Sequence, residues 1–333
     1  MTNNMGPKIV VIGGGTGSFT VLSGLKNYAS NITAIVNMAD DGGSTGQLRD
    51  ELGVLPPGDI RQCLVALSDS PRVRELFNYR FEEGSFKGHA SGNIFLTALE
   101  KMTGSFAEAI DVADEVLNVR GRVIPVTLDN VHLIMRQRQG NDIIGEYNIG
   151  NMKFNLGEDR PILELSPPAK INAEAKKAIL DADLVVIAPG NLYGSLAPAL
   201  LVKGMKQALK ETKAQLAYVC NLVTKPGQTD GFMVHDFADE IERFIGFPAL
   251  DFVLYNTQQP NKQLLLKYQR DQEYGVDFEK DKLNTRHYKA KGYNLISKEI
   301  PESSKTDIIA KTRSLIRHDP DIVARQIMKL YFS

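Results

Sequence analysis

Near its N-terminus the chain reads Lys8-Ile9-Val10-Val11-Ile12-Gly13-Gly14-Gly15-Thr16-Gly17-Ser18. The short apolar run 8–12 is typical of a buried strand in a parallel sheet. Its glycines allow a tight turn and a close approach of the backbone to a ligand, while Thr16 and Ser18 add hydroxyl donors. We expect a helix over 18–28, whose free N–H groups and dipole favour an anion at the same place. The stretch therefore predicts a loop that binds the phosphate of a nucleotide-like ligand.

This loop differs from two well-known phosphate-binding motifs. The dinucleotide fingerprint G-x-G-x-x-G would need glycine where Ser18 stands, and the lysine of the P-loop is missing. An acidic residue about 20 positions after a glycine loop suits a ribose contact, and Asp40 lies at about that distance from Gly17. A nicotinamide-dependent oxidoreductase, or adventitious binding of NAD, therefore stays open.

The rest of the chain continues the alternation of strands and helices. We expect further strands over 32–36, 184–188, 215–220 and 252–255, and helices over 173–181, 194–209, 234–245 and 322–330. This pattern predicts an α/β, Rossmann-like, doubly wound and mostly parallel sheet with helices on both faces. We interpret residues 1–333 as a single α/β domain, with a polar irregular excursion around 258–304.

The middle of the chain departs from this alternation. Helices are expected over 59–67, 71–79, 93–102 and 106–117. Runs 123–126 and 131–136 indicate strands that could form a hairpin, and 142–156 alternates weakly. We therefore expect a small irregular or antiparallel excursion here.

Composition narrows the class of protein. The 333 residues carry 39 Lys and Arg against 40 Asp and Glu, a net charge of −1, which argues against a general nucleic-acid binder. No stretch approaches the roughly 18 consecutive apolar residues of a membrane span, and no apolar signal-peptide core precedes the first strand. Cys63 and Cys220 form no CxxC pair, which fits a reducing compartment. We expect a cytoplasmic protein; a homo-oligomer such as a dimer stays open.

A second glycine-rich loop, Asn37-Met38-Ala39-Asp40-Asp41-Gly42-Gly43-Ser44-Thr45-Gly46, follows the second strand. In a parallel sheet it would lie beside the first loop. Asp40 and Asp41 could hold Mg²⁺ or accept from sugar hydroxyls, and Gly43 and Ser44 suit contact with a ligand. The alternative is a solvated turn, since Asp and Gly favour turns.

Part of this loop matches Gly-x-Ser-x-Gly, the motif of a hydrolase nucleophile elbow. Such an elbow is a sharp turn directly between a strand and a helix. We expect no helix to start near Thr45, and the expected strand ends well before Ser44, at Val36. A ligand loop is therefore favoured over a nucleophile.

Other polar segments precede helices or follow strands. Asp59 in Pro57-Gly58-Asp59 could be an N-cap or a functional residue. The segment Gly88-His89-Ala90-Ser91-Gly92-Asn93 could contact phosphate through His89 and Asn93, although a loop histidine is more often structural. Two strand-end loops add candidates for phosphate binding, namely Gly190, Asn191 and Ser195 in one and Asn221 and Thr224 in the other.

In combination, these segments resemble the YvcK/CofD-like superfamily, and its YvcK branch most closely. The matching segments are 12–17, 39–44, 57–59, 88–93, Pro189-Gly190-Asn191-Leu192-Tyr193-Gly194-Ser195, Asn221-Leu222-Val223-Thr224 and Arg317-His318-Asp319. The CofD branch usually has Gly-Pro-Ser-Asn-Pro where this chain has Ala188-Pro189-Gly190-Asn191-Leu192.

The resemblance implies a Rossmann-like core and a nucleotide-linked ligand. In the YvcK branch the implied ligand is a UDP-sugar such as UDP-N-acetylglucosamine, contacted by a tyrosine, here Tyr268, and by Arg317. The implied role is regulation of cell shape and wall synthesis during growth on gluconeogenic carbon sources, with no required cofactor. In the CofD branch it implies Mg²⁺-dependent transfer of a phospholactyl-type group to a deazaflavin.

Overall fold

The sheet is built around β1 (Lys8–Gly13), which pairs with β2 (Asn31–Val36) on one side and β7 (Leu184–Ile187) on the other. The computed structural model describes residues 6–137, 141–154, 160–298 and 315–332. Within these ranges, seven strands form one parallel sheet in the order β10-β9-β8-β7-β1-β2-β3. The other strands are β3 (Arg122–Pro125), β8 (Gln215–Val219), β9 (Phe252–Asn256) and β10 (Lys289–Tyr293).

The strand order explains where a ligand would bind. From β1 the chain runs outward through β2 to β3, and it then returns to the other side of β1 to run outward from β7 to β10. The order therefore reverses between β1 and β7, which is the topological switch point of a doubly wound fold. The predicted Rossmann-like α/β class is confirmed.

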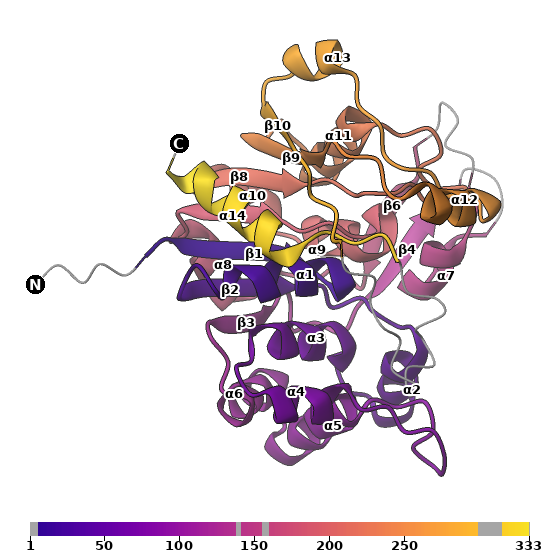
Figure 1. Cartoon of the computed structure of the whole chain (residues 1–333). Coiled ribbons are helices and arrows are strands. Elements are labelled where there is room, and N and C mark those ends of the chain that lie inside the picture. Colours follow the sequence, from indigo (N-terminus) through magenta and orange to yellow (C-terminus); the bar gives the residue numbers. More distant parts are fainter. Residues whose placement is uncertain (1–5, 138–140, 155–159, 299–314, 333) are drawn as a thin grey trace, which may run out of the picture.

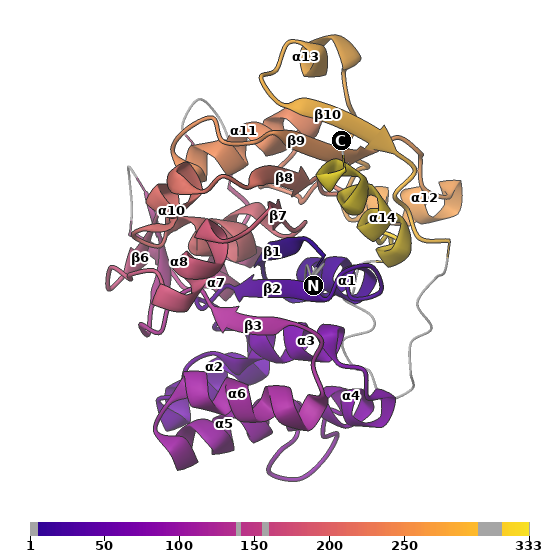
Figure 2. The ribbon, with the colours of Figure 1, turned by 90° about the vertical axis from the view of Figure 1, so that its left-hand side faces the viewer.

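Helices cover both faces of this sheet. Figure 2 shows α1 and α14 on one face and α8 and α10 on the other. Their bounds are α1 Gly15–Leu25, α14 Pro320–Tyr331, α8 Ala173–Leu180 and α10 Met205–Glu211. Close packing joins α1 to α14, because a Cβ added to Gly24 would lie 2.0 Å from the carbonyl oxygen of Pro320. None of the helices in the described ranges is long and apolar enough to cross a membrane.

A group of helices lies beyond β3 (Figure 1). It comprises α2 (Gly43–Leu52), α3 (Pro57–Leu67), α4 (Pro71–Asn78), α5 (Ser91–Thr103) and α6 (Phe106–Leu117). The expectation that no helix starts near Thr45 is wrong. Two glycines and a charged C-terminal half gave α2 no apolar periodicity, yet Thr45 and Arg49 are buried on it.

The expected small antiparallel sheet is confirmed, with the order β5-β4-β6. Its strands are β4 (His132–Arg136), β5 (Ile143–Ile144) and β6 (Ile162–Ser166), and α7 (Glu146–Asn151) follows β5. The suggested hairpin is wrong, because β3 pairs with β2 while β4 pairs with β5 and β6. Short apolar runs do not reveal their partners. Positions 155 and 156 of the weakly alternating stretch lie outside the described residues.

Two further stretches differ from their sequence patterns. The expected helix 194–209 is divided into a π-helical turn η1 (Leu192–Leu196), α9 (Ala197–Leu201) and α10, with Gly204 at φ +104°. The polar excursion 258–304 contains α12 (Lys262–Arg270), α13 (Lys280–Asn284) and the edge strand β10. The lysines of β10 suit an exposed edge and hide the strand pattern. Residues 299–304 lie outside the described residues. The helix α11 (Val234–Ile245) has the bounds predicted from the sequence.

Candidate functional site

The loop after β1 meets the loop after β7 in a very close backbone contact. A Cβ added to Gly17 would lie 1.7 Å from the carbonyl oxygen of Pro189, so no larger residue fits there without a shift of the chain. Gly15 has φ +62°, in the region that favours glycine. The N-cap Gly14 supplies no side-chain oxygen to the start of α1. The structure thus brings the glycine loops of β1 and β7 together at the switch point.

The two hydroxyls of the first loop lie in different surroundings. Thr16 is exposed, whereas Ser18 is buried beneath Gly13 and its Oγ has no hydrogen-bond partner in the described ranges. Phosphate binding by these loop residues stays a prediction. The geometry makes Thr16 the more accessible donor of the two.

Two asparagines fix the shape of the loop after β7. Asn221 brackets Gly190, since its Nδ2 donates to the Gly190 carbonyl at 2.8 Å and its Oδ1 accepts from the Gly190 N–H at 3.3 Å. Asn191 Oδ1 accepts from the N–H groups of Tyr193 and Gly194 at 3.1 and 3.2 Å. These contacts give both asparagines a role in shaping the loop, alongside the predicted one in binding.

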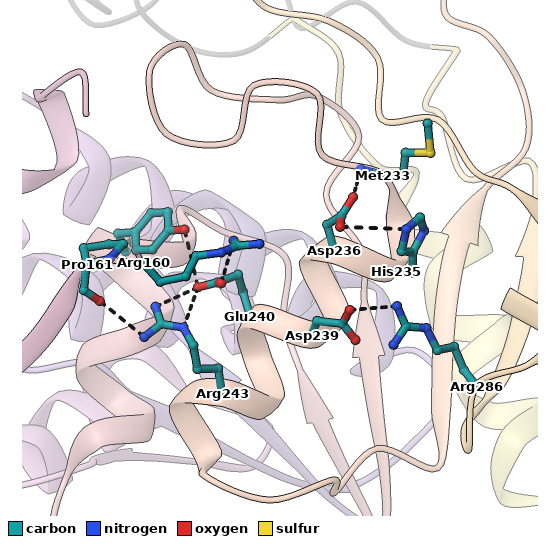
Figure 3. A network of polar contacts seen from close by, with 10 residues as sticks. Arg160, Pro161, Met233, His235, Asp236, Asp239, Glu240, Arg243 and Arg286 are labelled. Carbon is teal, nitrogen blue, oxygen red and sulfur yellow. Dashed lines mark hydrogen bonds and ion pairs between the residues drawn. The ribbon is translucent and has the colours of Figure 1, made fainter. Parts of the chain in front are cut away.

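A buried carboxylate with two partly exposed arginine partners contacts the segment that follows this loop. Glu240 of α11 accepts from the Tyr193 hydroxyl at 3.4 Å and pairs with Arg160 at 2.6 Å and Arg243 at 2.7 Å (Figure 3). Tyr193 belongs to η1, directly after the loop. The cluster therefore ties the start of η1 to α11. Sequence patterns did not reveal it, because Glu240 lies in an ordinary amphipathic helix.

Two carboxyl groups, Asp59 and Asp40, lie close to the first loop and to the start of α3. Asp59 lies against the loop: a Cβ added to Gly14 would be 2.1 Å from Asp59 Oδ2, and the Gly15 N–H donates to the same carboxyl group. Asp40 lies beside the start of the same helix α3, where a Cβ added to Gly58 would be 2.8 Å from Asp40 Oδ2. Of the two readings of Asp59, the structure therefore supports a position in the site.

Burial and repulsion between neighbouring carboxylates together raise the pKa values of these carboxyl groups. Burial, and then the nearby Asp40, raise the pKa of Asp59 to about 7. Burial, followed by Asp40 and Asp59, raises the pKa of Glu146 to about 8. Burial also raises the pKa of Asp40. The amine of Lys225 lies close enough to Glu146 to interact with its charge. Burial lowers the pKa of Lys225, and the nearby Glu146 carboxyl group raises it in part.

Asp40 and Asp41, the two residues predicted as possible Mg²⁺ ligands, accept hydrogen bonds from different segments of the chain. Asp41 Oδ1 accepts from the Tyr147 N–H at 2.7 Å and so anchors α7, whereas Asp40 Oδ1 accepts from the Gly42 N–H at 3.0 Å. In the described part of the chain, no three acidic, histidine or cysteine side chains are placed to hold a metal ion. Binding of Mg²⁺ by Asp40 and Asp41 stays a prediction.

Ser44, His89 and Asn93 form one connected group. Ser44 Oγ lies 3.0 Å from His89 Nδ1 and accepts from Asn93 Nδ2 at 3.2 Å. Arg61, which sequence reasoning missed, donates to Asn93 Oδ1 at 2.9 Å. The three predicted residues are therefore brought together at the start of α2.

The remaining predicted residues lie farther along the same sheet edge. Thr224 is buried and exchanges hydrogen bonds with Tyr274. Tyr268 is only 7% exposed, and its hydroxyl accepts from the Ile316 N–H at 3.1 Å. The structure thus gives Tyr268 a packing role, and its predicted contact with a UDP-sugar stays a prediction.

Arg317 follows directly after that contact. Its carbonyl accepts from the Ser297 N–H at 2.8 Å. The neighbouring His318 is buried, which lowers its pKa to about 4, and it lies 3.1 Å from the Cys220 carbonyl. A cavity of about 370 Å³ adjoins this segment. Its lining includes Gln258, Gln259, Asn261, Asn294, Ser297 and Ile316.

Comparison with known proteins places this fold and site in a family. The family model described as 2-phospho-L-lactate transferase CofD matches residues 9–300, and the chain belongs to this family. Within it, the chain resembles the gluconeogenesis factors of the YvcK type. It is 46% identical over 276 residues to the putative gluconeogenesis factor of Thermotoga maritima, covering 81% of this chain and 84% of that protein. It is 37% identical over 328 residues to the gluconeogenesis factor of Bacillus subtilis, covering 97% and 98%.

A solved structure agrees with this placement. A UPF0052 family member from Bacillus halodurans superposes with a TM-score of 0.86 at 34% identity, covering 98% of this chain and 100% of that one. The resemblance to the YvcK/CofD-like superfamily is confirmed.

The raised pKa of Glu146 predicts a pH-dependent cost to stability. The unfolded chain releases this proton near the ordinary glutamate pKa of 4.5, whereas the folded chain holds it up to about pH 8, so stability is lost as pH rises between these values. Glutamine cannot ionise, so the variant Glu146→Gln should avoid this loss. The difference in free energy of unfolding between the variant and the wild type should therefore be more favourable to the variant by about 1–3 kcal/mol at about pH 9 than at about pH 5. Chemical denaturation at both pH values measures this. Exposed Glu83→Gln is the control, and equal effects of both variants would contradict the assignment.

Proposed function

We propose that the protein binds a UDP-sugar, such as UDP-N-acetylglucosamine, along the carboxyl edge of the main sheet. The observation that carries this proposal is the contact between the glycine loops of β1 and β7 at the switch point. In open α/β sheets, ligands bind in the crevice outside the carboxyl ends of the strands at that point. The Gly15 N–H at the start of α1 donates to Asp59, and the following N–H groups of this turn suit one phosphate of a diphosphate.

The layout of the edge supports an extended ligand. The strand β9 is three strands from β1, a separation of about 14 Å at the usual strand spacing. The cavity beside Arg317 follows the ends of β9 and β10, and its amide side chains offer donors and acceptors for a planar base such as uracil. A UDP-sugar could place its diphosphate at the glycine loops of the switch point and its base in the cavity beside Arg317.

Charge decides how such a ligand could bind. Asp40, Asp41, Asp59 and Glu146 influence one another, and Lys225 is the amine that faces Glu146. A diphosphate would be repelled by four ionised carboxylates. Protonation of Asp59 and Glu146, or Mg²⁺ held by Asp40 and Asp59, would reduce this repulsion.

A regulatory role fits the relatives' names better than turnover does. The related proteins are called gluconeogenesis factors, and no name among those quoted from Thermotoga or Bacillus describes a reaction. We infer a cytoplasmic sensor that supports cell shape and wall synthesis during growth on gluconeogenic carbon sources.

A second candidate is Mg²⁺-dependent transfer of the CofD type. The family description and the position of Asp40 and Asp59 beside the phosphate loop favour it. Incubating the protein with Mg²⁺, an activated phospholactyl nucleotide and the deazaflavin acceptor tests for the adduct by mass spectrometry. Product would establish catalysis, and its absence beside a working control enzyme would remove this candidate.

Calorimetric titration tests the proposed ligand. We expect UDP-N-acetylglucosamine to bind the wild type, and NAD to bind more weakly if at all. Arg317→Ala should weaken binding of the UDP-sugar by about tenfold, the usual loss for a hydrogen bond to a charged group. Arg325→Ala, which removes an exposed ion pair with Asp321 on α14, is the matched control.

Two results would count against the proposal. Folded wild-type protein that gives no heat with millimolar UDP-N-acetylglucosamine would overturn the ligand. Equal affinities of wild type and Arg317→Ala would overturn the assignment of this residue alone.

A further inference from the structure

A series of hydrogen bonds begins at Arg61, and each donor in it fixes which atom of the next residue accepts. This buried arginine of α3 donates from Nε to Asn93 Oδ1 at 2.9 Å and from Nη1 to Asn78 Oδ1 at 2.6 Å. A guanidinium can only donate, so the amide of Asn93 must turn its oxygen toward Arg61. The Asn93 amide nitrogen then points to Ser44 Oγ, at 3.2 Å.

The direction passes through Ser44 to His89. Because Ser44 Oγ accepts from Asn93, its own hydrogen is left for the other neighbour, His89 Nδ1, at 3.0 Å. Ser44 is 8% exposed, and no other acceptor for its hydrogen is found in the described ranges. His89 Nδ1 is therefore an acceptor, and in the neutral ring the proton lies on Nε2.

The backbone around His89 is also held in place. The His89 N–H donates to the Phe86 carbonyl at 2.9 Å, and its carbonyl accepts from the Phe81 N–H at 3.0 Å. Within the described ranges, His89 Nε2 has no hydrogen-bond partner. Ser44, to which the ring is tied, lies in the first turn of α2, directly after the loop that carries Asp40 and Asp41.

We propose that His89 contacts the bound ligand as a hydrogen-bond donor through Nε2–H, and that Arg61, Asn93 and Ser44 are positioning residues that hold this tautomer. The chemical group recognised is an anionic oxygen, such as a phosphate oxygen of the nucleotide sugar. The identity of the ligand rests on the proposed function, but the direction of the chain does not. Asn93 and Ser44 thus act through His89 rather than on the ligand.

The variant Asn93→Asp tests the direction of the chain. A carboxylate at this position can still accept from Arg61, but it cannot donate to Ser44, so the Ser44 hydroxyl would turn to it. His89 Nδ1 would then carry a proton and donate to Ser44. Long-range ¹⁵N–¹H spectra report which ring nitrogens are protonated. We expect protonation on Nε2 alone in the wild type and on Nδ1 in Asn93→Asp, with Asn27→Asp, in the exposed turn after α1, as a charge-matched control.

Substitutions at His89 test the contact with the ligand. The amide nitrogen of glutamine lies near the place of Nε2, whereas that of asparagine lies near Nδ1. In titrations with UDP-N-acetylglucosamine, His89→Gln should stay within about threefold of the wild type, and His89→Asn should bind about tenfold more weakly. Circular dichroism confirms that each variant is folded.

The outcomes separate this inference from the proposed function. A wild-type His89 protonated on Nδ1 alone would overturn the tautomer, whatever ligand binds. Binding of UDP-N-acetylglucosamine that is unchanged in His89→Asn and Asn93→Asp would overturn the contact while the proposed function stands. If the wild type does not bind UDP-N-acetylglucosamine, the proposed ligand is wrong. The NMR spectra would still decide the direction of the hydrogen bonds from Arg61 to His89.

Discussion

The backbone of Gly17 lies directly against the carbonyl group of Pro189, where the loop after β1 meets the loop after β7. This contact is available only to glycine, and it joins the two halves of the sheet at the point where the strand order reverses. It fixes the start of α1 beside the start of η1. The polar residues at the ends of the other strands lie around this junction, on the same edge of the sheet.

Charge is the second constraint on the site. Its carboxyl groups are buried close enough together to raise one another's pKa, and a protein gains no stability from such an arrangement. Perturbed groups of this kind are typical of functional sites. For the proposed anionic ligand, the same groups would make binding depend on protons or a cation. A sensor built this way would respond to its ionic surroundings as well as to its ligand.

The sequence predicted the sheet well because buried parallel strands such as 8–12 and 184–188 are short, apolar and followed by glycine. It failed where burial does not produce a pattern: α2 buries Thr45 and Arg49, and β10 is an exposed edge strand rich in lysine. For the site, it predicted Ser44 in one loop, and His89 and Asn93 together in another segment. Their connection and the part of Arg61 depend on side chains that meet only in three dimensions, and the same is true of Asp59 at Gly14 and of Glu146.

A crystal structure of the protein with UDP-N-acetylglucosamine is the most direct measurement of the central claim. We expect the diphosphate to lie in the crevice between the loops of Gly15 and Gly190, with the uracil toward the cavity beside Arg317. A nucleotide bound elsewhere on the molecule, with the crevice between these two loops empty at saturating ligand, would contradict this claim.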